Sequence, residues 1–295
     1  MEFRTIVDIP ESPWKIEPCE RMLFIGSCFA DNIGKRFTEE KFRAVVNPYG
    51  VMYTPASILH TVRRLTQDDA MPFSPDEQGT AVMTLGTNHV YILKETGEIV
   101  DNCQKRPQRL FEERELSITE CAAYLDKAIQ LISHRFPKTR FILTVSPIRY
   151  RKYGYHESQL SKATLMLAID SLVKAQTSTP GGHSTTVDAQ RITYFPSFEI
   201  INDELRDYRF YKPDMLHPSD QAVDYIFERM ASTYFSDATT AFLKEWKPIR
   251  EALNHRPLHP ESEEYRLFRI KTEERLKQLE DKYNGRPQGP QPANH

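Results

Sequence analysis

The stretch Arg21-Met-Leu-Phe-Ile-Gly-Ser-Cys-Phe-Ala30 decides how this chain begins to fold. Its apolar run predicts a buried strand, and the strand ends abruptly at Gly26. The following residues are apolar at helix spacing, at Phe29, Ile33 and Phe37. Ser27 therefore lies between a strand and a helix N-terminus, where outward backbone N–H groups favour negative charge. Such a turn suits the nucleophilic serine of an acyl-transfer enzyme, and equally a plain connection built from small residues.

Strands and helices alternate over most of the remaining chain. We expect further strands at 43–47, 81–85, 89–93, 98–100, 141–146 and 192–195. Helices are expected at 55–65, at 117–136 behind a capping box, at 158–174 and from 218 onward. The inward stripe of the helix at 158–174 is expected to consist of Leu160, Ala163, Leu167, Leu172 and Val173. This alternation is typical of an α/β fold with a parallel sheet covered by helices on both faces.

The chain is expected to form one α/β domain over residues 1–237. A turn at Thr96-Gly97 predicts a β-hairpin inserted into this domain. Residues 238–284 are helical in pattern and strongly charged, which indicates a C-terminal helical extension. Residues 285–295 are rich in Pro, Gln and Asn, which is typical of a disordered tail.

Composition limits the classes of function. The 295 residues are 39% hydrophobic and 27% charged, as in a globular protein with a sizeable core. A net charge of −2, with Lys and Arg spread along the chain, argues against nucleic acid or a membrane surface as the partner. No secretory signal or membrane span is evident, so we expect a cytoplasmic location. The four cysteines form no C-x-x-C pair and are expected to be reduced thiols rather than a disulfide framework or a zinc site.

A second chemical signal is the pair Asp214 and His217, three residues apart and ahead of a predicted helix. A turn between them can bring the carboxylate to one ring nitrogen and leave the other for a substrate. Asp214 would then fix the tautomer of His217 and stabilise the imidazolium formed when His217 takes a proton from Ser27. The nearby helix N-terminus favours the neutral imidazole that a general base needs. The alternative is a loop aspartate that caps the helix beside a surface histidine.

Each candidate residue follows an expected strand. Because a doubly wound sheet binds ligands at the carboxyl ends of its strands, these residues are expected to lie together. Ser27 follows the first strand, Gly50 the second and Asn88 the third. The backbone N–H groups of Ser27 and Gly50, with the side-chain amide of Asn88, would supply three donors to a tetrahedral oxyanion. Gly50 has no side chain, and its N–H is expected to be unobstructed.

The order Ser27, Gly50, Asn88 and Asp214-x-x-His217 resembles that of the SGNH (GDSL-like) hydrolases. The residues Gly-Ser-Cys-Phe-Ala at 26–30 resemble the signature of the GSCFA branch. Further similar segments are Asn47–Gly50, Asn102–Lys105, Val145–Arg149 and Asp214–Ser219. The resemblance spans about residues 3 to 250.

The resemblance implies a three-layer αβα sandwich with a flavodoxin-like sheet. It implies Ser27 as nucleophile, His217 as base and Asp214 as the acid that orients it, with Gly50 and Asn88 at the oxyanion positions. The implied activity is that of a serine esterase that removes small acyl groups, such as acetyl, from a carbohydrate or related metabolite. No cofactor is implied.

Several alternatives stay open on the sequence alone. Cys28 competes with Ser27 as nucleophile, because a helix N-terminus stabilises a thiolate. A binding module would keep the pocket without turnover. Arg149 and Tyr150 follow an expected strand, where they either contact the substrate or belong to an ordinary polar loop. An α/β-hydrolase is disfavoured because the G-x-S-x-G elbow is absent.

A metal site is not expected. His255 and His259 have helix spacing, but Pro257 between them disrupts a shared helical face. The acidic residues Asp203, Glu204 and Asp207 are interpreted as a solvated cluster rather than a cation site.

Overall fold

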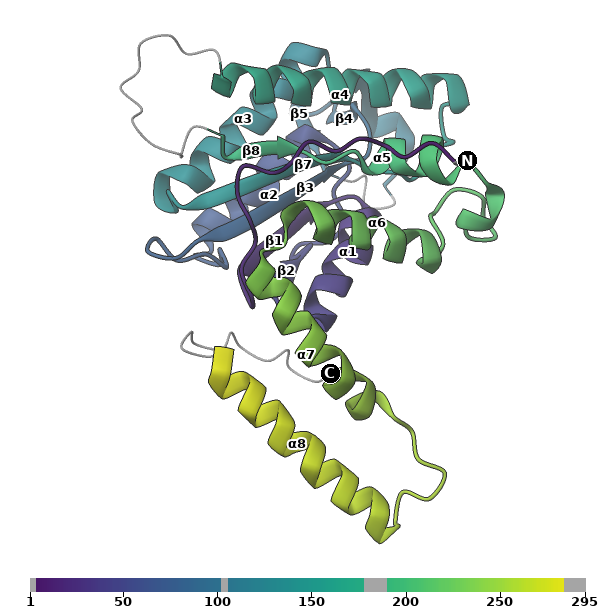
Figure 1. The fold of residues 1–295 in the computed structure, drawn as a ribbon. Helices are drawn as coiled ribbons and strands as arrows, with labels where there is room; N and C mark the ends of the chain where they lie inside the picture. Colours follow the sequence, from purple (N-terminus) through teal and green to yellow (C-terminus); the bar gives the residue numbers. More distant parts are fainter. Residues whose placement is uncertain (1–3, 102–105, 178–189, 284–295) are drawn as a thin grey trace.

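The computed structural model describes residues 4–101, 106–177 and 190–283. Its centre is a five-stranded parallel sheet in the order β2-β1-β3-β7-β8 (Figure 1). The strands are β1 (Arg21–Gly26), β2 (Arg43–Val46), β3 (Gly79–Leu85), β7 (Thr139–Val145) and β8 (Ile192–Tyr194). This order is that of flavodoxin-like doubly wound sheets. The expected α/β fold with a parallel sheet is confirmed.

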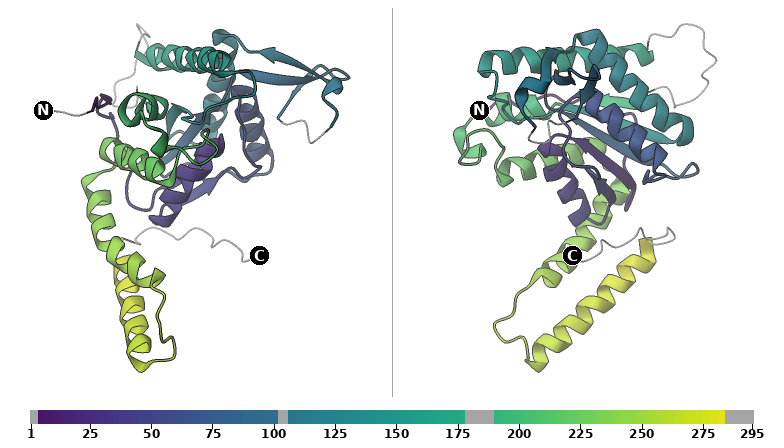
Figure 2. Two further views of the ribbon diagram at one scale, coloured as in Figure 1. Left: turned by 90° about the vertical axis from the view of Figure 1, so that its right-hand side faces the viewer. Right: turned by 180° about the vertical axis from the view of Figure 1, so that it is seen from behind.

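Alternate residues of the strands enter two separate cores, one on each face of the sheet. In β1, Leu23 and Ile25 join the first core, whereas Met22 and Phe24 join the second. The first core is covered by α2 (Pro55–Gln67), α3 (Ile118–Arg135) and α4 (Tyr155–Thr177). The second is covered by α1 (Cys28–Glu39) and α6 (Asp220–Tyr234). Helices thus lie on both faces, and the expected three layers are visible in Figures 1 and 2.

The inserted hairpin belongs to a larger unit than the sequence predicts. Strands β4 (His89–Leu93) and β5 (Glu98–Val100) pair antiparallel, as expected. A further strand, β6 (Phe111–Glu115), pairs with the other edge of β4 and completes a three-stranded sheet. A 3-10 turn, Gln108–Leu110, leads into it. The charged sequence of β6 has no run of alternating apolar residues, and the strand was therefore not predicted.

The predicted inward stripe of α4 is wrong at Leu160, Ala163 and Leu167, which are exposed, whereas Leu172 and Val173 pack against the first core as expected. Leu160 and Leu167 are 49% and 52% exposed, and Leu165, Ala168 and Ile169 are buried in the first core instead. Ser161 and Lys162 also face inward, because their polar groups bond to the loops at the ends of β3 and β7. Because these two polar residues are on the inner face, the buried face of α4 is rotated about the helix axis relative to the face that Leu160 and Leu167 predict.

The segment between β8 and α6 contains only short helical elements. It contains the short α5 (Ser197–Glu199), a π-helical stretch (Ile200–Leu205) and a 3-10 turn (Tyr208–Phe210). The stretch Ile200–Leu205 packs Ile200, Ile201 and Leu205 into the second core. An irregular segment there carries the chain from the sheet towards the Asp214–His217 turn.

The C-terminal region is helical, as expected. Helices α7 (Asp237–Asn254) and α8 (Glu263–Tyr283) form a hairpin that extends away from the α/β body (Figures 1 and 2). Its own small core contains Phe242, Trp246, Ile249 and Leu279. The Trp246 indole donates to the Glu39 carbonyl at 3.0 Å, which docks the hairpin on the end of α1. The expected tail at 285–295 lies outside the described residues.

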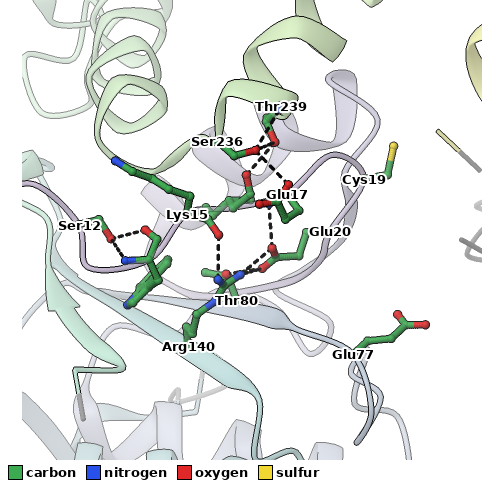
Figure 3. Close-up of polar contacts among 12 residues, drawn as sticks. Ser12, Lys15, Glu17, Cys19, Glu20, Glu77, Thr80, Arg140, Ser236 and Thr239 are labelled. Atoms are coloured by element: carbon green, nitrogen blue, oxygen red, sulfur yellow. Dashed lines mark hydrogen bonds and ion pairs between the residues drawn. The ribbon is translucent and has the colours of Figure 1, made fainter. Parts of the chain in front are cut away.

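A buried polar cluster at the starts of the strands holds the N-terminal segment on the sheet (Figure 3). The Arg140 guanidinium bonds both carboxylate oxygens of Glu20 at 2.6 and 2.7 Å, and these side chains are 8% and 2% exposed. The Thr80 hydroxyl donates to the same carboxylate at 2.6 Å. A second Arg140 nitrogen donates to the Lys15 carbonyl at 2.8 Å. Arg140 Nε is buried without a partner among the described residues, but both terminal guanidinium nitrogens and the Glu20 carboxylate are paired within the protein, which marks this cluster as structural.

Candidate active site

The turn between β1 and α1 packs directly against the end of β3. Gly26 has a φ of +135°, and a Cβ atom there would lie 2.1 Å from the Thr84 carbonyl oxygen, so only glycine fits. The Ser27 backbone N–H donates to the Thr84 carbonyl at 3.0 Å and to Thr84 Oγ1 at 2.9 Å. This close approach fixes the turn at the carboxyl-end edge of the sheet, as the sequence predicts.

Ser27 is the N-cap of α1. Its hydroxyl accepts a hydrogen bond from the Phe29 N–H at 3.3 Å and lies 2.9 Å from the Thr84 hydroxyl. The residue is 1% exposed. In this conformation, the Ser27 hydroxyl is occupied by partners inside the protein. Helix capping by itself accounts for a serine at this position.

Cys28, the first residue of α1, is more accessible than Ser27. Its thiol lies 3.4 Å from the Tyr53 hydroxyl. Burial and then the contact with Cys28 raise the pKa of Tyr53, which keeps the phenol protonated and able to donate to sulfur. The Cys28 backbone N–H has no acceptor among the described residues, as is usual for the first N–H of a helix.

The loop after β2 ties the end of β1 to α1. Asn47 Oδ1 accepts from the Gly26 N–H at 2.9 Å, and Asn47 Nδ2 donates to the Asp31 carboxylate at 2.6 Å. The Gly50 N–H donates to the Asn47 carbonyl at 2.8 Å, closing a turn. The expectation of an unobstructed Gly50 N–H is therefore wrong. Gly50 has a φ of +89° and open space where a side chain would be, so the turn itself explains the glycine.

Asn88 links the parallel sheet to the inserted sheet. Its Nδ2 donates to the Leu116 carbonyl at 2.8 Å, and its backbone N–H donates to the Ser161 hydroxyl at 3.0 Å. The residue is 2% exposed, and its buried Oδ1 has no partner among the described residues. The Ser27 N–H, the Gly50 N–H and the Asn88 amide thus all donate within the protein, so this conformation offers no ready set of three oxyanion donors among the described residues.

Asp214 and His217 make the pair that their spacing predicts. Asp214 Oδ2 lies 2.6 Å from His217 Nδ1, and Oδ1 accepts the N–H groups of Leu216 at 2.8 Å and His217 at 3.0 Å. These two backbone donors and then the imidazole hold the pKa of Asp214 well below its usual range. Nδ1 of His217 therefore carries the shared proton, and Nε2 is the nitrogen able to accept one. Among the described residues, nothing bonds to Nε2.

The loop after β7 ties the Asp214–His217 turn to the same edge of the sheet as Ser27. The Arg149 N–H donates to the Leu216 carbonyl at 3.0 Å. Tyr150, the next residue, is half-buried with its ring centroid 5.6 Å from that of Tyr153, and burial raises its pKa. Ser27 and His217 share no hydrogen bond in the described part of the chain. Catalytic hydrogen bonds are often long or misaligned in unliganded structures.

The sequence matches the GSCFA family over residues 21–77 and 74–230, which includes the β1–α1 turn and the Asp214–His217 turn. The chain belongs to the GSCFA family. Residues 246–286 match the C-terminal domain of GSCFA domain proteins. No curated protein matches the sequence significantly. A solved structure described provisionally as a platelet activating factor from Streptococcus pneumonia is similar at 17% identity and a TM-score of 0.43. The similarity covers 73% of this chain and 84% of that one.

In this GSCFA family member, a buried lysine that the sequence analysis does not single out lies beside the candidate site. Lys162 of α4 donates to the Gly86 carbonyl at 2.8 Å and to the Ser146 carbonyl at 2.9 Å, which joins the loops after β3 and β7. Burial lowers its pKa to about 7. The signal in the sequence was its position three and seven residues before the buried Leu165 and Ile169, on one helix face.

The interpretation of 203–207 as a solvated acidic cluster is wrong for one member. Glu204 is 4% exposed, accepts the Val7 N–H at 3.2 Å and bonds to the Tyr225 hydroxyl. It fastens the N-terminal segment to α6.

None of the described helices is long and apolar enough to cross a bilayer.

Proposed function

We propose that this protein is an acyl hydrolase of the SGNH type that cleaves a small acyl ester through a covalent acyl-enzyme. The observation that carries the proposal is the 2.6 Å hydrogen bond between Asp214 and His217 Nδ1. It orients the imidazole ring so that Nε2 is left free to take a proton. The proposed substrate is an acetyl or similar ester of a carbohydrate or related metabolite. The scheme uses amino-acid side chains and water.

In the first form of the mechanism, the Ser27 hydroxyl attacks the ester carbonyl carbon while His217 Nε2 takes its proton. The tetrahedral intermediate then expels the alcohol, which leaves with that proton, and the acyl group stays on Ser27 Oγ. Water, deprotonated by His217, releases the acid in the second half. In this form, Ser27 must first leave its contact with the Thr84 hydroxyl at 2.9 Å.

Accessibility favours a second form in which Cys28 is the nucleophile. Ser27 is 1% exposed, whereas the Cys28 thiol is partly exposed at the start of α1. The Cys28 N–H has no acceptor among the described residues and is thus available to an oxyanion, unlike the three donors expected from the sequence. Gly50 and Asn88 would serve only after a rearrangement that releases their present acceptors.

One experiment tests the hydrolase and separates the two nucleophiles. Wild type, Ser27→Ala, Cys28→Ala and His217→Ala are assayed with a chromogenic acetyl ester and labelled with a fluorophosphonate and with iodoacetamide. Cys19→Ala is the control, because it removes another partly accessible thiol far along the chain from the dyad. We expect loss of turnover in His217→Ala and in whichever nucleophile variant removes the attacking atom.

The outcomes divide cleanly. Loss in Ser27→Ala with fluorophosphonate labelling supports the serine form, and loss in Cys28→Ala with iodoacetamide labelling supports the thiol form. Turnover in His217→Ala equal to that of wild type excludes both forms. A folded wild type without turnover on a panel of acyl esters favours a binding module, for which the occupied donors of Gly50 and Asn88 are a supporting observation.

A further inference from the structure

We propose that Arg149 is a positioning residue that holds the turn between Asp214 and His217 in the conformation that aligns the two side chains. The sequence left open whether Arg149 contacts substrate or belongs to a polar loop. Its contacts in the structure are to the dyad turn instead. The effect on turnover rests on the proposed function, whereas the effect on the imidazole does not.

Arg149 binds the two residues that separate Asp214 from His217. Its backbone N–H donates to the Leu216 carbonyl at 3.0 Å, and its Nη1 donates to the Met215 carbonyl at 3.1 Å. One residue thus holds two successive carbonyls of the turn. Because Arg149 follows β7, these bonds connect the turn to a rigid strand of the central sheet.

The turn has a backbone conformation that needs such support. Met215 has a φ of +59°, in the left-handed region that residues with a Cβ atom rarely adopt. The residue is 43% exposed, so side-chain packing contributes little to holding it there. Within the turn, the Met215 N–H donates to the Lys212 carbonyl at 2.8 Å. Arg149 adds the contact from a separate element on the carbonyl side of the same residue.

The guanidinium is itself held in place by aromatic rings. Its central carbon lies 4.3 Å from the ring centroid of Tyr155 and 5.7 Å from that of Tyr211. Arg149 forms no ion pair with any described carboxylate. A planar group that stacks on rings and donates at its edge is a role that lysine reproduces poorly. These contacts hold the guanidinium against the turn, and they do not indicate a side chain that binds an anionic substrate.

The test compares Arg149→Met, Arg149→Lys and the control Arg151→Met, which removes an exposed arginine from the same loop. The first measurement is the ¹⁵N chemical shift of the His217 ring nitrogens in the neutral imidazole, which reports the fraction of molecules with the proton on Nδ1. The second is the separate determination of kcat and KM with the acetyl ester. Circular dichroism and thermal melting establish that each variant is folded.

We expect Arg149→Met to lose the predominance of the Nδ1–H form and to lower kcat about 10- to 100-fold, with KM changed less than about threefold. Arg149→Lys should fall between Arg149→Met and wild type, and Arg151→Met should match wild type. Wild-type nitrogen shifts in a folded Arg149→Met would overturn the proposal, as would a rise in KM at unchanged kcat. If Arg149→Met does not fold, the shifts of Arg149→Lys decide.

The two proposals fail in different ways. If the wild type hydrolyses no ester, the nitrogen shifts of His217 still test whether Arg149 positions the ring. If the shifts move in Arg149→Met but turnover does not, Arg149 positions His217 and the histidine is not the base. Loss of turnover with unmoved shifts would make Arg149 a contact of the substrate and overturn the positioning role.

Discussion

Lys162 Nζ lies 2.8 Å from the carbonyl oxygen of Gly86, in the fully buried interior beneath the candidate site. Its other acceptor is the Ser146 carbonyl, and its ammonium nitrogen lies 5.8 Å from the centroid of the Phe198 ring. It forms no ion pair with a described carboxylate. A buried cation without a counter-ion is costly, and this cost lowers its pKa to about 7.

The first prediction concerns the pH dependence of stability. Because the folded pKa of Lys162 is about 7 and that of an unfolded lysine is about 10.4, the unfolded state binds more protons between these values. The contribution of Lys162 to the free energy of unfolding should therefore increase by on the order of 4 kcal/mol as pH rises from about 7 to about 10. Urea titrations across this range should show a smaller gain in Lys162→Met than in wild type.

Lys127→Met is the control for Lys162→Met, because Lys127 is exposed on α3. Comparison of variants removes the contribution of the tyrosines and cysteines that titrate in the same range. A wild-type pH profile in Lys162→Met would mean that Lys162 is solvated in the native state.

The second prediction concerns Ser27 as a helix cap. Ser27→Ala removes the acceptor of the Phe29 N–H and the partner of the Thr84 hydroxyl. We expect the free energy of unfolding to fall by about 1–2 kcal/mol. Cys28→Ala removes a partly exposed thiol at the next position and should change it by less than about 0.5 kcal/mol. Chemical denaturation measures both. A gain of stability in Ser27→Ala would instead indicate a strained group kept for catalysis.

The third prediction concerns the approach of the turn to β3. Gly26→Ala would place a methyl group 2.1 Å from the Thr84 carbonyl oxygen, at a φ of +135°. We expect it to lower the free energy of unfolding by more than about 4 kcal/mol or to prevent folding. Gly97→Ala is the matched control, since Gly97 has a φ of +71° with nothing within 4 Å of the added carbon. It should cost about 1 kcal/mol. Similar melting temperatures for the two variants would contradict the steric argument.

The parts of the molecule that the sequence predicts correctly depend on local patterns. The β1–α1 turn follows from an apolar run, a glycine and helix spacing within residues 21–37. Asp214 and His217 are three residues apart, and a single turn is enough to bring them into contact. Both inferences need only the geometry of a short segment, which residue types and spacing specify well.

The parts that the sequence predicts wrongly depend on contacts between distant segments. The Asn88 amide is engaged by Leu116 of the loop after β6, a strand whose charged sequence gives no β signal. The stripe on α4 was assigned to exposed leucines, because the carbonyls that draw Lys162 inward lie in other loops. Hydrogen-bond partners of this kind are fixed by the tertiary fold, and no periodicity in one segment encodes them.

The last prediction separates the structural cluster from the candidate site. Glu20 and Arg140 lie at the starts of the strands, whereas Ser27 and Arg149 follow their carboxyl ends. Glu20→Gln leaves the Arg140 charge buried without its partner, and we expect the free energy of unfolding to fall by about 3–5 kcal/mol. Glu11→Gln is the control. Glu11 forms an ion pair with Lys15, but its side chain is 86% exposed, so this substitution should change the free energy of unfolding by less than about 1 kcal/mol.

At a temperature at which Glu20→Gln remains folded, the ¹⁵N shifts of the His217 ring in this variant should equal those of wild type. Altered shifts there would mean that the two edges of the sheet are coupled, and that the cluster in Figure 3 also supports the dyad.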